Sequence, residues 1–111
     1  MPATGGPVLD TRVTREGATV VVALSGELDL ATAGRLRSCL APIVTAPTAP
    51  EALVLDLSEL RFLDASGISA LLTVQRALAA RGGRLALRSP SRLVRRVVKV
   101  LDLDGLLPVV R

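Results

Sequence analysis

The stretch from Ala52 to Leu72 constrains the fold most, because its hydrophobic pattern changes from that of a strand to that of a helix. The apolar run Leu53–Leu55 is typical of a buried strand. After it, apolar residues recur at helical spacing at Ile68, Leu71, Leu72 and Leu78. A strand that leads into a helix within one short segment predicts an α/β chain.

The junction of this strand and helix, Asp64-Ala65-Ser66-Gly67, is the best candidate for a working site. Ser66 stands where the N-cap residue of the helix is expected. A phosphate on its hydroxyl would lie near free N–H groups and the positive end of the helix dipole, so the folded chain could carry it. Spacing alone favours a structural cap over a phosphorylation site. Asp64 is open to the same two interpretations, since acids are common at helix starts.

Further elements are expected on both sides of this junction. We predict strands over 8–13, 19–24, 53–55, 85–87 and 107–110. Thr32 is expected to cap a first helix that Pro42 should bend or end early, and residues 45–50 should form a loop. The apolar stripe of that helix would be Ala33, Leu36, Leu40 and Ile43.

The last helix is expected to begin with Ser89 as its cap and to end before Gly105. Its charged residues should point outward, while its buried face would consist of Leu93, Val94, Val97, Val98 and Leu101. The resulting order is β-β-α-β-α-β-α-β. The fold class is therefore α/β, a single domain with a mixed β-sheet and helices packed against it.

Composition limits the function more than it defines it. The chain has 111 residues, which suits one domain over 8–111 preceded by a loose tail over 1–7. With no histidine and a single cysteine, Cys39, we expect no metal, no cofactor and no His-based catalysis. The absence of a signal sequence, of an apolar run long enough to cross a bilayer and of a possible internal disulfide predicts a cytoplasmic protein without membrane insertion.

Charge and acidic residues raise two further hypotheses. The net charge of +4 invites a nucleic-acid partner, but Phe62 is the sole aromatic residue, so no stacking surface exists and direct nucleic-acid binding is not expected. Asp64 paired with Asp29 or with Asp56 could suggest hydrolysis or Mg²⁺ binding. Without a nucleophile–base pair or a phosphate-binding loop, we do not expect an enzyme.

Two stretches together resemble a known family. Gly26-Glu-Leu-Asp-Leu-Ala-Thr-Ala33 is similar to the exit of the second strand of STAS domains, specifically those of bacterial anti-sigma factor antagonists. Leu55-Asp-Leu-Ser58, followed by Phe62-Leu-Asp-Ala-Ser-Gly-Ile68, is similar to the family's central strand and phosphorylation loop. The resemblance extends over about residues 8 to 110.

The resemblance implies a binding module and not a catalyst. Its partners would be an anti-sigma factor with serine kinase activity, which the unmodified protein sequesters so that a sigma factor is freed, and a serine phosphatase that resets the cycle. Ser66 would be the phosphorylated residue, although Ala65 replaces a hydroxyl common in the family and leaves Ser69 as a more distant candidate. The resemblance implies partner contacts at Asp29, Asp64, Ala65, Ser66, Gly67 and Ser69. The alternative is a soluble STAS subunit of a membrane transport or stress-signalling complex, with Ser66 as a contact residue.

Overall fold

The computed structural model describes residues 8–110, which form one mixed sheet of five strands and three helices in the predicted order. The predicted tail over 1–7 lies outside the described residues. The strands are β1 (Leu9–Glu16), β2 (Thr19–Leu28), β3 (Ala52–Leu63), β4 (Arg84–Arg88) and β5 (Val109–Val110), and the helices are α1 (Ala33–Thr45), α2 (Ala65–Ala79) and α3 (Arg92–Val100).

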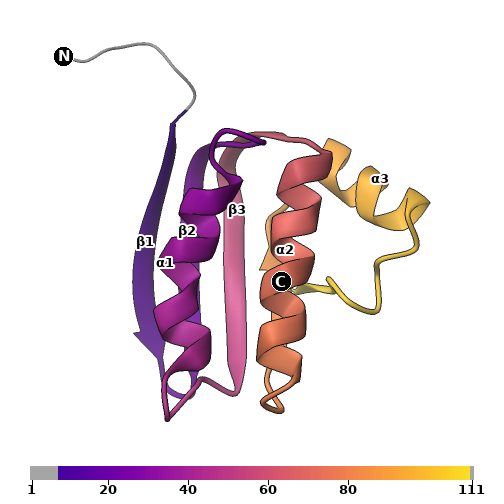
Figure 1. Cartoon of the computed structure of the whole chain (residues 1–111). Coiled ribbons are helices and arrows are strands. Elements are labelled where there is room, and N and C mark those ends of the chain that lie inside the picture. Colours follow the sequence, from indigo (N-terminus) through magenta and orange to yellow (C-terminus); the bar gives the residue numbers. More distant parts are fainter. Residues whose placement is uncertain (1–7, 111) are drawn as a thin grey trace, which may run out of the picture.

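The sheet has the strand order β1-β2-β3-β4-β5. β1 and β2 form the predicted antiparallel hairpin, while β2, β3, β4 and β5 run parallel. Each parallel connection carries a helix and steps across the sheet in the same direction, so right-handed crossovers put the helices on one face. In Figure 1, α1 and α2 lie side by side over the sheet, and α3 lies beyond α2.

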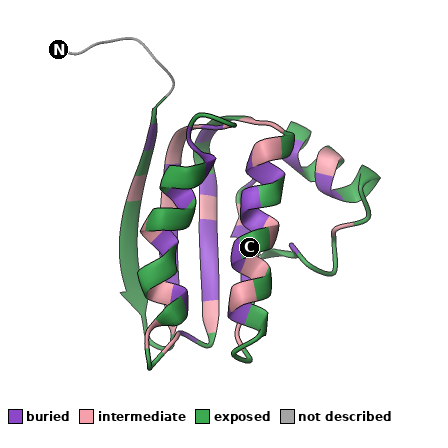
Figure 2. Cartoon of the chain, in the orientation of Figure 1, coloured by how far each residue is buried: buried purple, intermediate pink, exposed green. Residues whose placement is uncertain are grey.

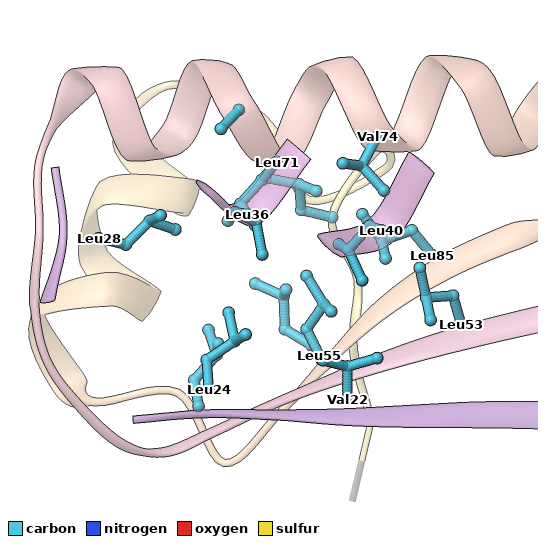
Figure 3. Close-up of a cluster of buried hydrophobic side chains, with 14 of the residues drawn as sticks. Val22, Leu24, Leu28, Leu36, Leu40, Leu53, Leu55, Leu71, Val74 and Leu85 are labelled. Atoms are coloured by element: carbon cyan, nitrogen blue, oxygen red, sulfur yellow. The ribbon is translucent and has the colours of Figure 1, made fainter. Parts of the chain in front are cut away.

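The core lies between the sheet and the helices. Branched aliphatic side chains fill it, and the β2 and β3 residues that face the helices alternate with residues on the other face, as a pleated strand requires. Figure 2 shows the buried stripes of α1 and α2, and Figure 3 shows part of the cluster that they cover: Val22, Leu24, Leu28, Leu36, Leu40, Leu53, Leu55, Leu71, Val74 and Leu85.

The two central strands are longer than the sequence predicts. β2 continues past Leu24 to Leu28, and β3 continues past Leu55 to Leu63. Their register shifts twice, between the β2 positions Ala23 and Ser25 and again between Gly26 and Glu27, and β3 carries the extra residue each time. Such irregularities bend a strand without ending it. Polar residues and Gly26 had suggested that the strands end early, whereas the strands only bend there.

Of the two effects predicted for Pro42, a bend or an early end of the helix, the early end does not occur. The helix continues to Thr45, and Pro42 lies in its last turns on an exposed side, where the lost N–H bond to Ser38 does not disturb the buried stripe. The stripe is largely the predicted one, but Val44 is buried where Ile43 was expected and Ile43 is only half-buried. The predicted loop follows directly.

The limits of α3 also differ from the prediction. Ser91, not Ser89, caps the helix, because its hydroxyl accepts a hydrogen bond from the N–H of Val94 at 3.2 Å. The helix ends at Val100, and Asp102 rather than Gly105 takes the left-handed backbone conformation after it.

The buried face of α3 is narrower than its apolar face. Val94 and Val98 join the core, but Leu93 and Leu101 are 61% and 54% exposed instead of buried. Because α3 belongs to a short crossover at the edge of the sheet, neighbouring elements pack against only one side of this helix.

Candidate functional site

The two motif segments leave the sheet side by side. Leu28, the last residue of β2, pairs with Leu63, the last residue of β3. The next peptide links them again, because the N–H of Asp64 donates to the carbonyl of Leu28 at 3.3 Å. Both segments then start a helix, so the beginnings of α1 and α2 lie at the same end of the molecule (Figure 1).

Hydrogen bonds fix the loop that follows β2. The Oδ1 atom of Asp29 accepts from the N–H groups of Ala31 and Thr32, at 2.9 and 3.1 Å. The Thr32 hydroxyl accepts from the N–H of Asp29 at 3.0 Å and donates to the carbonyl of Glu27 at 2.7 Å. Thr32 thus occupies the predicted cap position of α1, but its buried side chain holds this loop instead of capping the helix.

This fixed loop displays Leu30 to solvent, with 80% of the residue exposed. Because hydrogen bonds fix the loop, Leu30 is presented to solvent in a defined position. Leu30 was not among the predicted site residues. It follows the Gly-Glu-Leu-Asp motif but belongs to no helical or strand stripe, and that exclusion from the core pattern was the available signal.

Asp64, and not Ser66, is the N-cap of α2. Its Oδ1 accepts from the N–H of Gly67 at 3.0 Å, and its carbonyl accepts from the N–H of Ile68 at 3.0 Å. The predicted cap Ser66 is instead the second residue of the helix. Its hydroxyl is therefore not used to satisfy the helix end, which removes the structural role that competed with modification.

Both motif glycines permit close packing of the chain. A Cβ atom on Gly67 would lie 2.7 Å from the carbonyl oxygen of Leu28 and 2.6 Å from a methyl carbon of Leu63. Gly26 has a φ of +104°, and a Cβ atom there would overlap the carbonyl oxygen of Val8. Any larger residue at Gly67 would push the start of α2 away from β2, so this buried glycine sets how closely the helix approaches that strand.

Ser66 lies half-buried at the edge of a hollow of about 340 Å³ between the first turns of α1 and α2. The predicted residues Ala65, Ser66 and Ser69 line it on the α2 side, and Ser69 is exposed. Leu30, Ala33 and Arg37 line it on the other side. Arg37 is the second residue that the sequence prediction missed, because an exposed arginine outside a helix stripe gives no signal until the facing helix is known.

The structure brings Asp29 and Asp64 together at the carboxyl ends of β2 and β3 but leaves Asp56 far from both. β3 runs on to Leu63, so Asp56 lies in the middle of the strand, about 20 Å from its end by strand geometry. Its Oδ1 accepts from the N–H of Ser58 at 2.9 Å. The pairing of Asp56 with Asp64 was therefore wrong. Among residues 8–110, no three His, Cys, Asp or Glu side chains gather closely enough to hold a metal ion.

Comparison with known proteins decides the family. The family model described as "Mlab, STAS domain" matches residues 11–108. This chain belongs to the STAS domain family. This STAS domain is 36% identical over 96 residues to an anti-sigma F factor antagonist of Lysinibacillus sphaericus, an alignment that covers 86% of the chain and 77% of the relative.

Solved structures agree with this assignment. An anti-sigma factor antagonist from Mycobacterium paratuberculosis superposes with a TM-score of 0.80 at 29% identity, covering 92% of this STAS domain and 85% of the other chain. The unphosphorylated form of the anti-sigma factor antagonist SpoIIAA gives 0.77 at 26% identity over 92% and 89% of the two chains. The phosphorylated form of SpoIIAA, a Bacillus cell fate determinant, gives 0.72 at 25% identity over 92% of each chain.

The relatives of this STAS domain are named as antagonists of other proteins, which describes binding and not catalysis. Within residues 8–110, no helix has both the length and the apolar character required to cross a membrane.

Proposed function

We propose that this STAS domain is an anti-sigma factor antagonist that binds an anti-sigma factor through the first turns of α1 and α2. That partner acts as a serine kinase, and its phosphorylation of Ser66 dissociates the complex. A serine phosphatase then restores the hydroxyl. The observation that supports this most is the hollow at the meeting point of the two family motifs, where Ser66 lies opposite the exposed Leu30. The use of ATP by the partner implies a cytoplasmic location.

Binding of the unmodified form would gain from burying Leu30. Complete burial of a leucine side chain contributes about 1.5–3 kcal/mol. Because hydrogen bonds already hold the Asp29 loop and the start of α2, little ordering would be needed on binding. The second carboxylate oxygens of Asp29 and Asp64 would be available to accept bonds from the partner.

Phosphorylation would reverse this gain through charge. Transfer breaks the bond between the γ-phosphorus and the bridging oxygen of ATP, forms an Oγ–P bond on Ser66 and leaves ADP, while the hydroxyl proton passes to a base of the kinase. The product carries about −1.5 to −2 charge at pH 7. A partner packed on the hollow would then have to take that charge out of water beside Asp29 and Asp64, and desolvating a charge costs several kcal/mol.

Phosphate transfer and binding test the proposal together. Anti-sigma factors encoded by the same genome are purified and incubated with ATP, Mg²⁺ and the wild type, Ser66→Ala or Ser69→Ala. We expect Ser66→Ala to abolish phosphate incorporation and Ser69→Ala, the matched control from the same hollow, to retain it. Calorimetry should show at least about a 100-fold weaker affinity after phosphorylation, equivalent to about 2.7 kcal/mol.

Two results would contradict the proposal. Phosphate found on Ser69 would show that Ser69, and not Ser66, is the modified residue. Equal affinity of the modified and unmodified forms for one partner would make Ser66 a contact residue, and the role of a constant subunit in a transport or signalling complex would then be favoured.

A further inference from the structure

We propose that Arg37 is the binding residue for the phosphate on Ser66, with which it forms an intramolecular ion pair across the hollow between α1 and α2. The proposal concerns the free, phosphorylated protein. It rests on the proposed function only in that Ser66 is the residue modified in the cell.

The geometry of the two helices directs Arg37 toward Ser66. Ala33 and Arg37 are one helical turn apart on the flank of α1 that lines the hollow, and Ser66 and Ser69 line it from α2. Side chains on a helix tilt toward its N-terminus, so Arg37 extends back toward the end of the molecule where Ser66 lies.

The position of the guanidinium agrees with this direction. Its Nη2 atom lies 3.9 Å from the place that a Cβ atom on Gly34 would occupy, so the side chain runs back along α1 by one turn. Gly34 carries no side chain that would compete for this space. The guanidinium therefore lies near the first turn of α1, and Arg37 lines the hollow there.

Arg37 is also free to take a new partner. Within residues 8–110, the ion pair present is the one between Arg88 and Glu16 at 3.9 Å, so no described carboxylate lies within 4.0 Å of Arg37. Arg37 supplies the positive charge among the residues that line the hollow, whereas Asp29 and Asp64 place negative charge at the nearby ends of β2 and β3. The planar guanidinium binds a phosphate monoester through two parallel hydrogen bonds.

The pair has a measurable consequence, because a nearby cation favours the dianion of the phosphate over the monoanion. We therefore expect Arg37 to lower the second pKa of the phosphate on Ser66. The test uses the full chain with phosphoserine encoded genetically at position 66, so that no kinase is needed. The pKa is followed by phosphorus NMR for this protein and for the same protein with Arg37→Gln, Arg37→Lys or Arg35→Gln.

Loss of the guanidinium should raise the phosphate pKa by about 0.5 unit, a modest value because the pair is exposed to solvent. Arg37→Lys should keep most of the lowering, and the difference should shrink in 0.5 M salt because an exposed pair is screened. Arg35→Gln is the matched control, since Arg35 is an exposed arginine of the same helix that does not line the hollow. Thermal unfolding of each variant verifies that the fold is retained.

Equal pKa values for the parent and Arg37→Gln would overturn the proposal, and so would an equal change in Arg35→Gln, which would indicate general charge and not a specific pair. These results are independent of the proposed function. A failure of any anti-sigma factor to modify Ser66 leaves the titration unaffected, and a failed titration leaves the transfer and release experiments unaffected.

Discussion

At the scale of single residues, Gly67 shows how packing and function share one position. The residue follows Ser66 in the motif, yet it is buried, and the Cα hydrogen that a side chain would replace faces the Leu28 carbonyl and the Leu63 side chain. The helix can start this close to β2 only because no Cβ atom intervenes. The place of Ser66 at the hollow therefore depends on a neighbour that a partner does not need to touch.

We predict that Gly67→Ala lowers the free energy of unfolding by about 2 kcal/mol, because the methyl group meets a backbone oxygen that cannot move cheaply. Gly34→Ala is the matched control. Gly34 is exposed near the start of α1, and a Cβ atom there would meet only the flexible Arg37 side chain at an ordinary contact distance of 3.9 Å, so alanine should be neutral or stabilise by up to about 1 kcal/mol through its helix propensity. Urea unfolding of both variants measures the difference. Equal stabilities would show that α2 shifts freely and that its start is not fixed by β2.

The sequence predicted which motif residues would meet, but not all of their roles. Asp64 and Ser66 are both favoured at helix caps, so local preference could not choose between them. The choice depends on the bond between the Asp64 N–H and Leu28, a residue 36 positions earlier in the chain. Arg37 had no local signal, and Leu30 had only its absence from every core stripe, because the importance of both residues arises from the helix that faces them.

At the scale of elements, prediction worked where a segment had one buried face and failed where the sheet edge changed the environment. The stripes of α1 and α2 pack largely as predicted, with Ile43 and Leu72 only half-buried, because each helix covers a central part of the sheet. In α3 the apolar residues extend over a wider arc than its neighbours cover, so Leu93 and Leu101 remain exposed. Periodicity reports which residues are apolar, and only the neighbouring elements determine which of them are buried.

The narrow buried face of α3 predicts losses of stability of different size for two substitutions in and next to this helix. Val98→Ala should lower the free energy of unfolding by about 2 kcal/mol, because Val98 is buried in the core and its removal leaves a cavity. Leu101→Ala removes a larger side chain but should change stability by less than about 0.5 kcal/mol, since that residue is mostly exposed. Denaturant unfolding of the two variants decides the point. A larger loss for Leu101→Ala would restore the wider buried face expected from the sequence.

At the scale of the whole molecule, the predicted order of elements and the mixed sheet are confirmed. Alternating strands and amphipathic helices leave few ways to bury their apolar faces, and right-handed crossovers then fix the face on which the helices lie. The same architecture gathers the beginnings of α1 and α2 at one end (Figure 1). A site formed there is supported by the sheet and does not require the chain to change its fold in order to switch.

We therefore predict that phosphorylation of Ser66 leaves the fold intact. The bonds that hold the site join Asp29 to Thr32, Asp64 to Gly67 and Asp64 to Leu28, and none of them uses the Ser66 hydroxyl. The added negative charge lies near the first turn of α2, where the helix dipole favours it by about 0.3–1 kcal/mol. In amide proton–nitrogen NMR spectra of the modified and unmodified chain, changes should be confined to residues 29–37 and 64–69, and the free energy of unfolding should differ by less than about 1 kcal/mol. Changes that extend through β4 and α3 would show instead that the phosphate acts by rearranging the core. The switch would then depend on a conformational change of the domain and not on the surface that Ser66 shares with Leu30 and Arg37.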